Sequence, residues 1–191
     1  MLFRSTRDLV LARSLQFGYI QRLGGSALIP LPERFFAGGA SSQRAFPDNQ
    51  AGPRDVGSNG SGATGFPLGG SAMLFHSTEL RFPLVGDNVG GVVFHDMGNV
   101  YSDIRNVSFR FRQNSVNDFD YMVHAVGFGI RYKTPVGPIR IDLAFSPNPP
   151  KFNGFSGTLQ DLINCSTARS CQTVPRSISH FQFHFSLGQT F

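Results

Sequence analysis

The stretch HFQFHFSLGQTF, residues 180–191, alternates large apolar side chains with polar or small ones. The apolar positions are Phe181, Phe183, Phe185, Leu187 and Phe191. His, Gln, Ser, Gly and Thr stand between them. Because successive side chains of a β-strand point to opposite faces, this alternation predicts a strand with one apolar and one polar face.

The same contrast of faces recurs upstream of this stretch. Alternation of apolar with polar or small residues marks segments 7–21, 72–82, 91–101, 125–132 and 139–145. Arg13 is an exception on the apolar side of the first segment, and 91–101 is less regular than the others. The sequence therefore predicts an all-β chain of about six strands.

The connections between these segments alternate in length. Short links at 83–90 and 134–137 separate long ones at about 22–70, 102–120 and 146–179. Outer-membrane barrels have short periplasmic turns and long extracellular loops. The order predicts a partial antiparallel transmembrane β-barrel with long extracellular loops and a periplasmic C-terminus.

Composition favours a membrane environment over water. The chain has 22 Gly and 20 Phe, and only 15% of its residues are charged, against about 25% in soluble globular chains. A soluble β-sandwich or lipocalin-like barrel, the alternative reading, would turn its charges outward. Here the face opposite the apolar one is mostly Gly, Ser, Ala, His and Gln, which suits a water-filled lumen.

Other classes of protein fit the sequence poorly. The net charge of +5 comes from arginines scattered between Arg4 and Arg176, whereas nucleic-acid binding needs clustered bases on one face. No apolar run of about 18 residues could form a transmembrane helix. The opening MLFRSTRDLVLARS lacks the uninterrupted apolar core of a signal peptide, which suggests a fragment or a missing N-terminus.

No arrangement typical of an enzyme or a metal site is visible. His95 and Asp96 are adjacent on a predicted strand, so their side chains should point to opposite faces and not form a catalytic pair. His124, His180 and His184 lack the further ligands of a metal site, and His180 and His184 are better explained as polar lumen residues. We expect no catalytic residues, no cofactor and no metal.

Cys165 and Cys171 lie six positions apart in a polar stretch. In an oxidising compartment they could close a small loop, and we favour a local disulfide over two free thiols.

Three parts of the chain together resemble the C-terminal barrel region of the BamA/TamA outer-membrane assembly superfamily, the bacterial surface antigen family. They are LPERFFAGGASSQRAF (31–46) with NQAGPRD (49–55), GGSAMLFHSTELRFPL (69–84) with VVFHDMGNVY (92–101), and GFGIRYKTPVGPIRIDLAF (127–145) with FQFHFSLGQTF (181–191). The resemblance implies the last six strands of a sixteen-strand barrel. Residues 1–191 would be the C-terminal portion of that barrel domain, without its periplasmic domains and earlier strands.

The resemblance also implies an interaction between a loop and the lumen wall. The family's long loop folds back into the barrel through a Val/Ile-Arg-Gly-Phe/Tyr motif, which here reads Gln43-Arg44-Ala45-Phe46. By this motif Arg44 would pair with Glu79 and Asp96. A guanidinium presents a rigid fork of donors that suits carboxylates. The alternative is a solvated arginine and two separate lumen charges.

The terminal strand resembles the C-terminal β-signal by which outer-membrane proteins are recognised for assembly. An exposed strand can pair through its backbone while alternate side chains give specificity; a simple lipid-facing strand is compatible with this. The implied function is assembly or insertion of outer-membrane proteins. The alternatives are a polypeptide-secretion transporter of the same superfamily and a passive structural barrel. The implied partners are outer-membrane lipid, unfolded outer-membrane protein clients and the rest of the barrel, with no nucleic acid.

Overall fold

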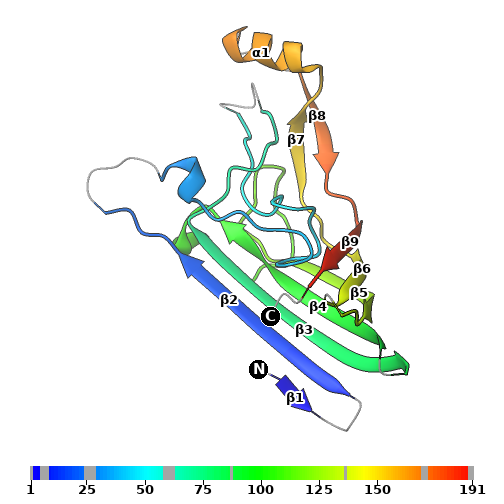
Figure 1. Cartoon of the computed structure of the whole chain (residues 1–191). Coiled ribbons are helices and arrows are strands. Elements are labelled where there is room, and N and C mark those ends of the chain that lie inside the picture. The colour runs from blue at the N-terminus through cyan, green and yellow to red at the C-terminus, as the bar shows by residue number, and fades with distance from the viewer. Residues whose placement is uncertain are drawn as a thin grey trace.

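A broad, curved antiparallel sheet carries long loops gathered at one end (Figure 1). The structure is a computed structural model that describes residues 2–4, 9–23, 29–57, 63–86, 88–135, 137–168 and 172–188. Its strands are β1 (Leu2–Arg4), β2 (Val10–Tyr19), β3 (Ala72–Val85), β4 (Val89–Tyr101), β5 (Val123–Tyr132), β6 (Ile139–Phe145), β7 (Lys151–Phe155), β8 (Thr173–Ser177) and β9 (Phe181–Leu187). Its helices are α1 (Leu159–Ala168) and the 3-10 turns Leu31–Glu33 and Ile104–Asn106.

The main sheet has seven strands in the order β1-β2-β3-β4-β5-β6-β9. Every neighbouring pair is antiparallel. The all-β antiparallel fold and its six predicted strands are confirmed, and the sheet does not close on itself. The structure adds a seventh, the short strand β1, at one edge.

The last long connection was predicted as a plain loop, and this was wrong. It contains a second sheet, the hairpin of β7 and β8, with α1 between the two strands. This hairpin rises from the main sheet among the long loops (Figure 1). β9 then returns to pair with β6, with Phe145 opposite Phe181 and Ile139 opposite Leu187.

One face of the sheet exposes large apolar side chains, as the alternation predicts. Phe183 of the last strand is 67% exposed, and the same face of the neighbouring strands is apolar too. The exposed apolar side chains of this face include Leu15, Phe17, Leu80, Val93, Val126, Phe128, Ile130, Ile141, Leu143, Phe181, Phe183, Phe185 and Leu187. Such a face suits lipid.

The opposite face is covered by the long connection between β2 and β3. Ala45, Phe46 and Ala51 from this connection pack with Phe75 and Phe94, which point inward from β3 and β4. Gly52 has a φ of 96°, and a Cβ on it would lie 2.7 Å from the Val100 side chain. Glycine therefore lets the loop backbone approach β4 closely.

The outer ends of the strands are tied together by side-chain hydrogen bonds to backbone. Asn148 donates to the carbonyls of Phe111 and Met122, at 2.7 and 2.8 Å. The Gln113 side chain and the Lys151 backbone exchange two hydrogen bonds of 2.7 and 2.9 Å. These contacts join the two loops that follow β4 and β6. Within the described part of the chain, no helix is long and apolar enough to cross a membrane.

Candidate functional site

The tip of the long loop, residues 43–46, lies buried against the inner face of the sheet. A compact turn forms this tip: the Phe46 N–H donates to the Gln43 carbonyl at 3.3 Å, and the Gly39 N–H donates to the Phe46 carbonyl at 3.0 Å. The apolar side chains of Ala45 and Phe46 are 0% and 1% exposed. Their burial anchors the turn and presents the neighbouring Arg44 to the wall.

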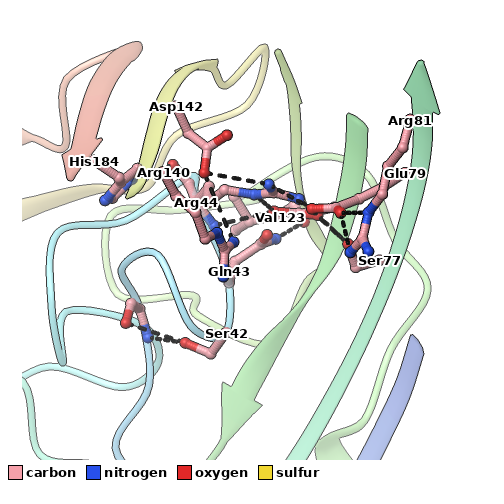
Figure 2. A network of polar contacts seen from close by, with 12 residues as sticks. Ser42, Gln43, Arg44, Ser77, Glu79, Arg81, Val123, Arg140, Asp142 and His184 are labelled. Carbon is pink, nitrogen blue, oxygen red and sulfur yellow. Dashed lines mark hydrogen bonds and ion pairs between the residues drawn. The ribbon is translucent and has the colours of Figure 1, made fainter. Parts of the chain in front are cut away.

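Arg44 makes a bidentate contact with Asp96. It reaches Glu79 as well (Figure 2). Its Nε and Nη2 donate to the Asp96 carboxylate at 2.7 and 2.8 Å, and its Nη1 donates to Glu79 Oε1 at 2.8 Å. The structure thus brings together the three charged residues that the loop motif predicts. We call Arg44, Glu79 and Asp96, with the buried Phe46, the loop-lumen lock.

Strand register explains why the two acids meet. Asp96 pairs with Ser77, and Glu79 lies two residues further along the same face of β3. Both carboxylates therefore point inward from adjacent strands, and both are 2% exposed. Two buried acids would repel each other without a cation, and Arg44 supplies it.

Further charged residues on the polar face of the strands extend the cluster. Arg81 donates to Glu79 through Nε and Nη2 at 2.9 and 2.7 Å. Asp142 on β6 lies 3.6 Å from Arg44 and 2.7 Å from Arg131, and Arg140 lies 3.8 Å from Asp142. All stand at inward positions of their strands, where the alternation predicts polar residues, but the sequence did not predict that they form one network.

The site is largely dry and closely packed. The Arg44 guanidinium lies over the Phe94 ring, 3.4 Å from its centroid. Beside it lies a cavity of about 30 Å³, enough room for about one water molecule. Its lining includes Phe75, Ser77, Arg140 and the three charged residues of the lock. Ion pairs in such a confined place are screened less than pairs on an open surface.

The loop tip also contacts β5 and β9. Gln43 Nε2 donates to the Val123 carbonyl at 2.8 Å. His184 on β9 lies 3.0 Å from the Arg44 carbonyl oxygen through Nε2; since a carbonyl can only accept, the imidazole donates. His184 was predicted to be a lumen residue, but its partner could not be predicted. With the ion pair to Asp142 on β6, the tip contacts five strands: β3, β4, β5, β6 and β9.

Farther along the same loop, Arg54 holds the backbone in place, and no acidic partner of Arg54 is found among the described residues. Its Nη1 and Nη2 donate to the carbonyls of Gly65 and Gln50 at 2.9 and 2.7 Å. Its guanidinium lies 4.1 Å from the centroid of the Phe152 ring on β7. Burial lowers the pKa of Arg54 to about 10, so it remains charged at neutral pH. No feature of the sequence singled it out.

His95 and Asp96 point to opposite faces of β4, as their parity predicts. His95 points to the outer face, where its ring stacks on His124 with centroids 5.3 Å apart, while Asp96 points inward. His180 contacts the Ser146 carbonyl through Nδ1 at 2.7 Å. Among the residues that the structure describes, no group of three His, Cys, Asp or Glu could hold a metal ion.

Some sites expected from sequence fall outside the described residues. Phe191, the last residue of the expected C-terminal signal, and Cys171 are among them. Cys165 belongs to α1, but its side chain is not described. The disulfide therefore stays a prediction.

Comparison with known proteins agrees with this geometry. Residues 2–191 match the Omp85 superfamily domain. The fold is similar to that of BamA from Haemophilus ducreyi lacking POTRA domains 1-3, with a TM-score of 0.57 and 22% sequence identity. The similarity covers 94% of this chain and 31% of that one, so the chain spans about a third of the structure it matches. The chain belongs to the Omp85 superfamily of the bacterial outer membrane, with a BamA-like barrel fold.

Proposed function

We propose that this chain is the barrel segment of a factor that assembles and inserts outer-membrane proteins. Its clients would be unfolded outer-membrane polypeptides, and its surroundings would be membrane lipid and the rest of its own barrel. It would act by pairing and exchanging strands, with no catalytic group, nucleotide or metal.

The loop-lumen lock is the observation that carries this proposal. Arg44 reaches two buried carboxylates on two strands that are 35 and 52 residues away in sequence. Such a contact fixes a long, otherwise costly loop in one position inside the lumen. A wall braced from inside can present a strand edge without collapsing.

The last strand supplies the second element of the proposal. β9 pairs with β6 alone among the described strands and so forms one edge of the main sheet. An edge strand offers unpaired backbone groups to another chain. An incoming client strand could pair there, guided by the alternating Phe side chains of this strand.

A polypeptide-secretion transporter of the same superfamily is the second candidate. The polar inner face favours it, because a water-filled lumen could pass an extended chain. The loop tip occupies that face, however, so export would require the tip to withdraw. A passive structural barrel would give no reason for so many buried charged contacts on one arginine.

A double-mutant cycle in the full-length parent protein tests the proposal. We expect Arg44→Ala and Asp96→Ala each to loosen the loop, at a cost of about 1–3 kcal/mol, because each leaves buried groups unpaired. The double variant should be little worse than either single one. The measurements are protease cleavage of residues 29–57 and the rate at which the reconstituted protein inserts a client barrel.

Two controls accompany this cycle. Arg44→Lys keeps the charge but loses the fork of donors, so it should rescue only partly. Ser41→Ala alters an exposed residue of the same loop and should change neither readout. An unaltered protein that inserts no client would contradict the assembly role. Normal insertion by a variant with a loosened loop would show that insertion does not need the lock, and additive effects would show that Arg44 and Asp96 act independently.

A further inference from the structure

The Arg44 backbone and side chain hold different parts of the wall at the same time. The side chain binds Glu79 on β3 and Asp96 on β4. The carbonyl oxygen of the same residue accepts a hydrogen bond from His184 on β9, at 3.0 Å. Figure 2 shows His184 beside Arg44, on the side away from Glu79. One residue thus connects the acid-bearing strands with the terminal strand.

His184 is placed to make this contact by strand register. It pairs with Asp142 across β6 and β9, so its side chain points to the inner face. It is 8% exposed, whereas Phe183 and Phe185 on either side are exposed on the outer face. A buried donor is stable only with an acceptor, and the Arg44 carbonyl provides it.

The other inward side chains of β9 do not reach the loop. Gln182 donates to the carbonyl of Ser179, three residues earlier in the chain. Ser186 Oγ is buried and has no hydrogen-bond partner in the described structure. Within the part of the chain that the structure describes, His184 therefore provides the hydrogen bond that joins β9 to the loop tip.

We infer that His184 is a positioning residue that couples the loop-lumen lock to the terminal strand. While Arg44 is seated, its carbonyl holds β9 against the inner contacts of the barrel. When the tip withdraws, the Asp96 contact and the His184 contact break together, and β9 is left with its ladder to β6. Loop release and loosening of the edge strand are then one event.

This inference deepens the proposed function, since it says what would free the strand edge for a client. It does not depend on assembly activity, because the coupling concerns two segments of the same protein. Hydrogen exchange can observe both segments at once, as local opening exposes backbone amides to solvent.

The test uses the full-length parent protein in lipid nanodiscs, with hydrogen exchange followed in residues 38–47 and 181–187. We expect His184→Ala to speed exchange in both segments, on the order of tenfold, the effect of losing one buried hydrogen bond. Arg44→Ala should speed exchange in β9 although the hydrogen bond of residue 44 to that strand comes from its backbone carbonyl. His184→Gln keeps an N–H donor at a similar reach and should restore both segments.

Gln182→Ala is the matched control, on the same face of the same strand but without a loop contact. It should leave exchange in residues 38–47 unchanged. Faster exchange in β9 alone after His184→Ala would overturn the coupling, as would an unchanged β9 after Arg44→Ala. Coupled exchange in a protein that inserts no client would retain the coupling and refute the proposed function instead.

Discussion

At the scale of single residues, Ala45 shows what the loop tip requires. The motif of the family usually has glycine here, a residue that would permit a positive φ. Among the non-glycine residues that the structure describes, Asn49 is the one with a positive φ, so the backbone at position 45 is open to alanine. The Ala45 side chain is 0% exposed. The position therefore accepts one methyl group and no more.

Replacing Ala45 by Leu tests this packing. The larger side chain should force the tip away from Phe75 and Phe94 and cost about 1–3 kcal/mol, as overpacking of a core does. Ala45→Gly, which restores the usual residue of the family, should cost less than about 1 kcal/mol. Thermal unfolding and protease cleavage of the loop measure both. The control is Ser41→Leu, at an exposed position; an Ala45→Leu variant as stable as this control would contradict the packing.

The residues of the loop-lumen lock could be predicted from the sequence only in part. Parity placed Glu79 and Asp96 on the inner face, and the resemblance identified Arg44 as the residue that would meet them. Asp142 carries the same inward parity, but its distance to Arg44 depends on the register of β5 and β6. The hydrogen bond from His184 to the Arg44 carbonyl joins residues 140 positions apart. Every residue has a backbone carbonyl, so the sequence pattern cannot identify this acceptor.

At the scale of elements, strands were predictable and loop structure was not. The predicted segment 139–145 coincides with β6, and 125–132 misses β5 by two residues at one end. Long alternating runs carry a strong signal because one whole face must stay apolar. β7 and β8 are five residues each and lie in a loop, where lipid imposes no such alternation.

The helix α1 had a signal that was overlooked. Thr158 and Asp161 cap its first turn reciprocally: the Thr158 N–H donates to Asp161 at 2.9 Å, and the Asp161 N–H donates to Thr158 Oγ1 at 3.2 Å. Ser or Thr followed three residues later by an acid is a recognised helix start. The reading of 146–179 as a plain loop gave this spacing no weight.

The loop between β4 and β5 yields a prediction on pH. The hydrogen bond from Arg110, at 2.8 Å, keeps the pKa of Asp118 below its ordinary value. A depressed carboxyl pKa means that the pair stabilises the loop above about pH 4 and that this stabilisation is lost as pH falls through the folded value. Burial, with the charge of Asp118, raises the pKa of Asp120, which acts in the opposite direction.

Pepsin digestion between about pH 2 and pH 5 measures this loop, since the ordinary pKa of an aspartate is near 4. We expect cleavage within residues 102–122 to begin on acidification, and Arg110→Ala to move its onset to higher pH. Arg112, exposed in the same loop, provides the matched control as Arg112→Ala. An onset that Arg110→Ala leaves in place would show that the pair does not hold the loop.

At the scale of the whole molecule, the described sheet has two chemically different faces and two open edges. Its outer face carries exposed aromatic and aliphatic side chains, and its inner face carries the charged cluster and the loop tip. Because β1 and β9 are the edge strands of the described sheet, more strands are needed to close a barrel. Closure would bury the inner face from both sides and strengthen the ion pairs of the lock.

The direction of the strands in the membrane follows from the connections. The connections 20–71, 102–122 and 146–180 lie at one end of the sheet, and the tight links 86–88 and 133–138 lie at the other. Short turns of outer-membrane barrels face the periplasm, so the loop-lumen lock must enter from the extracellular side.

In the full-length parent with Cys165 and Cys171 replaced, single cysteines at Asn114 and Asn88 test this orientation with a thiol reagent that does not cross the membrane. Both side chains are exposed in the structure, so a difference in labelling would report the side of the membrane and not burial. We expect labelling at Asn114 and none at Asn88 in intact cells, and labelling of both after the outer membrane is permeabilised; the reverse pattern in intact cells would invert every strand and place the lock at the periplasmic end.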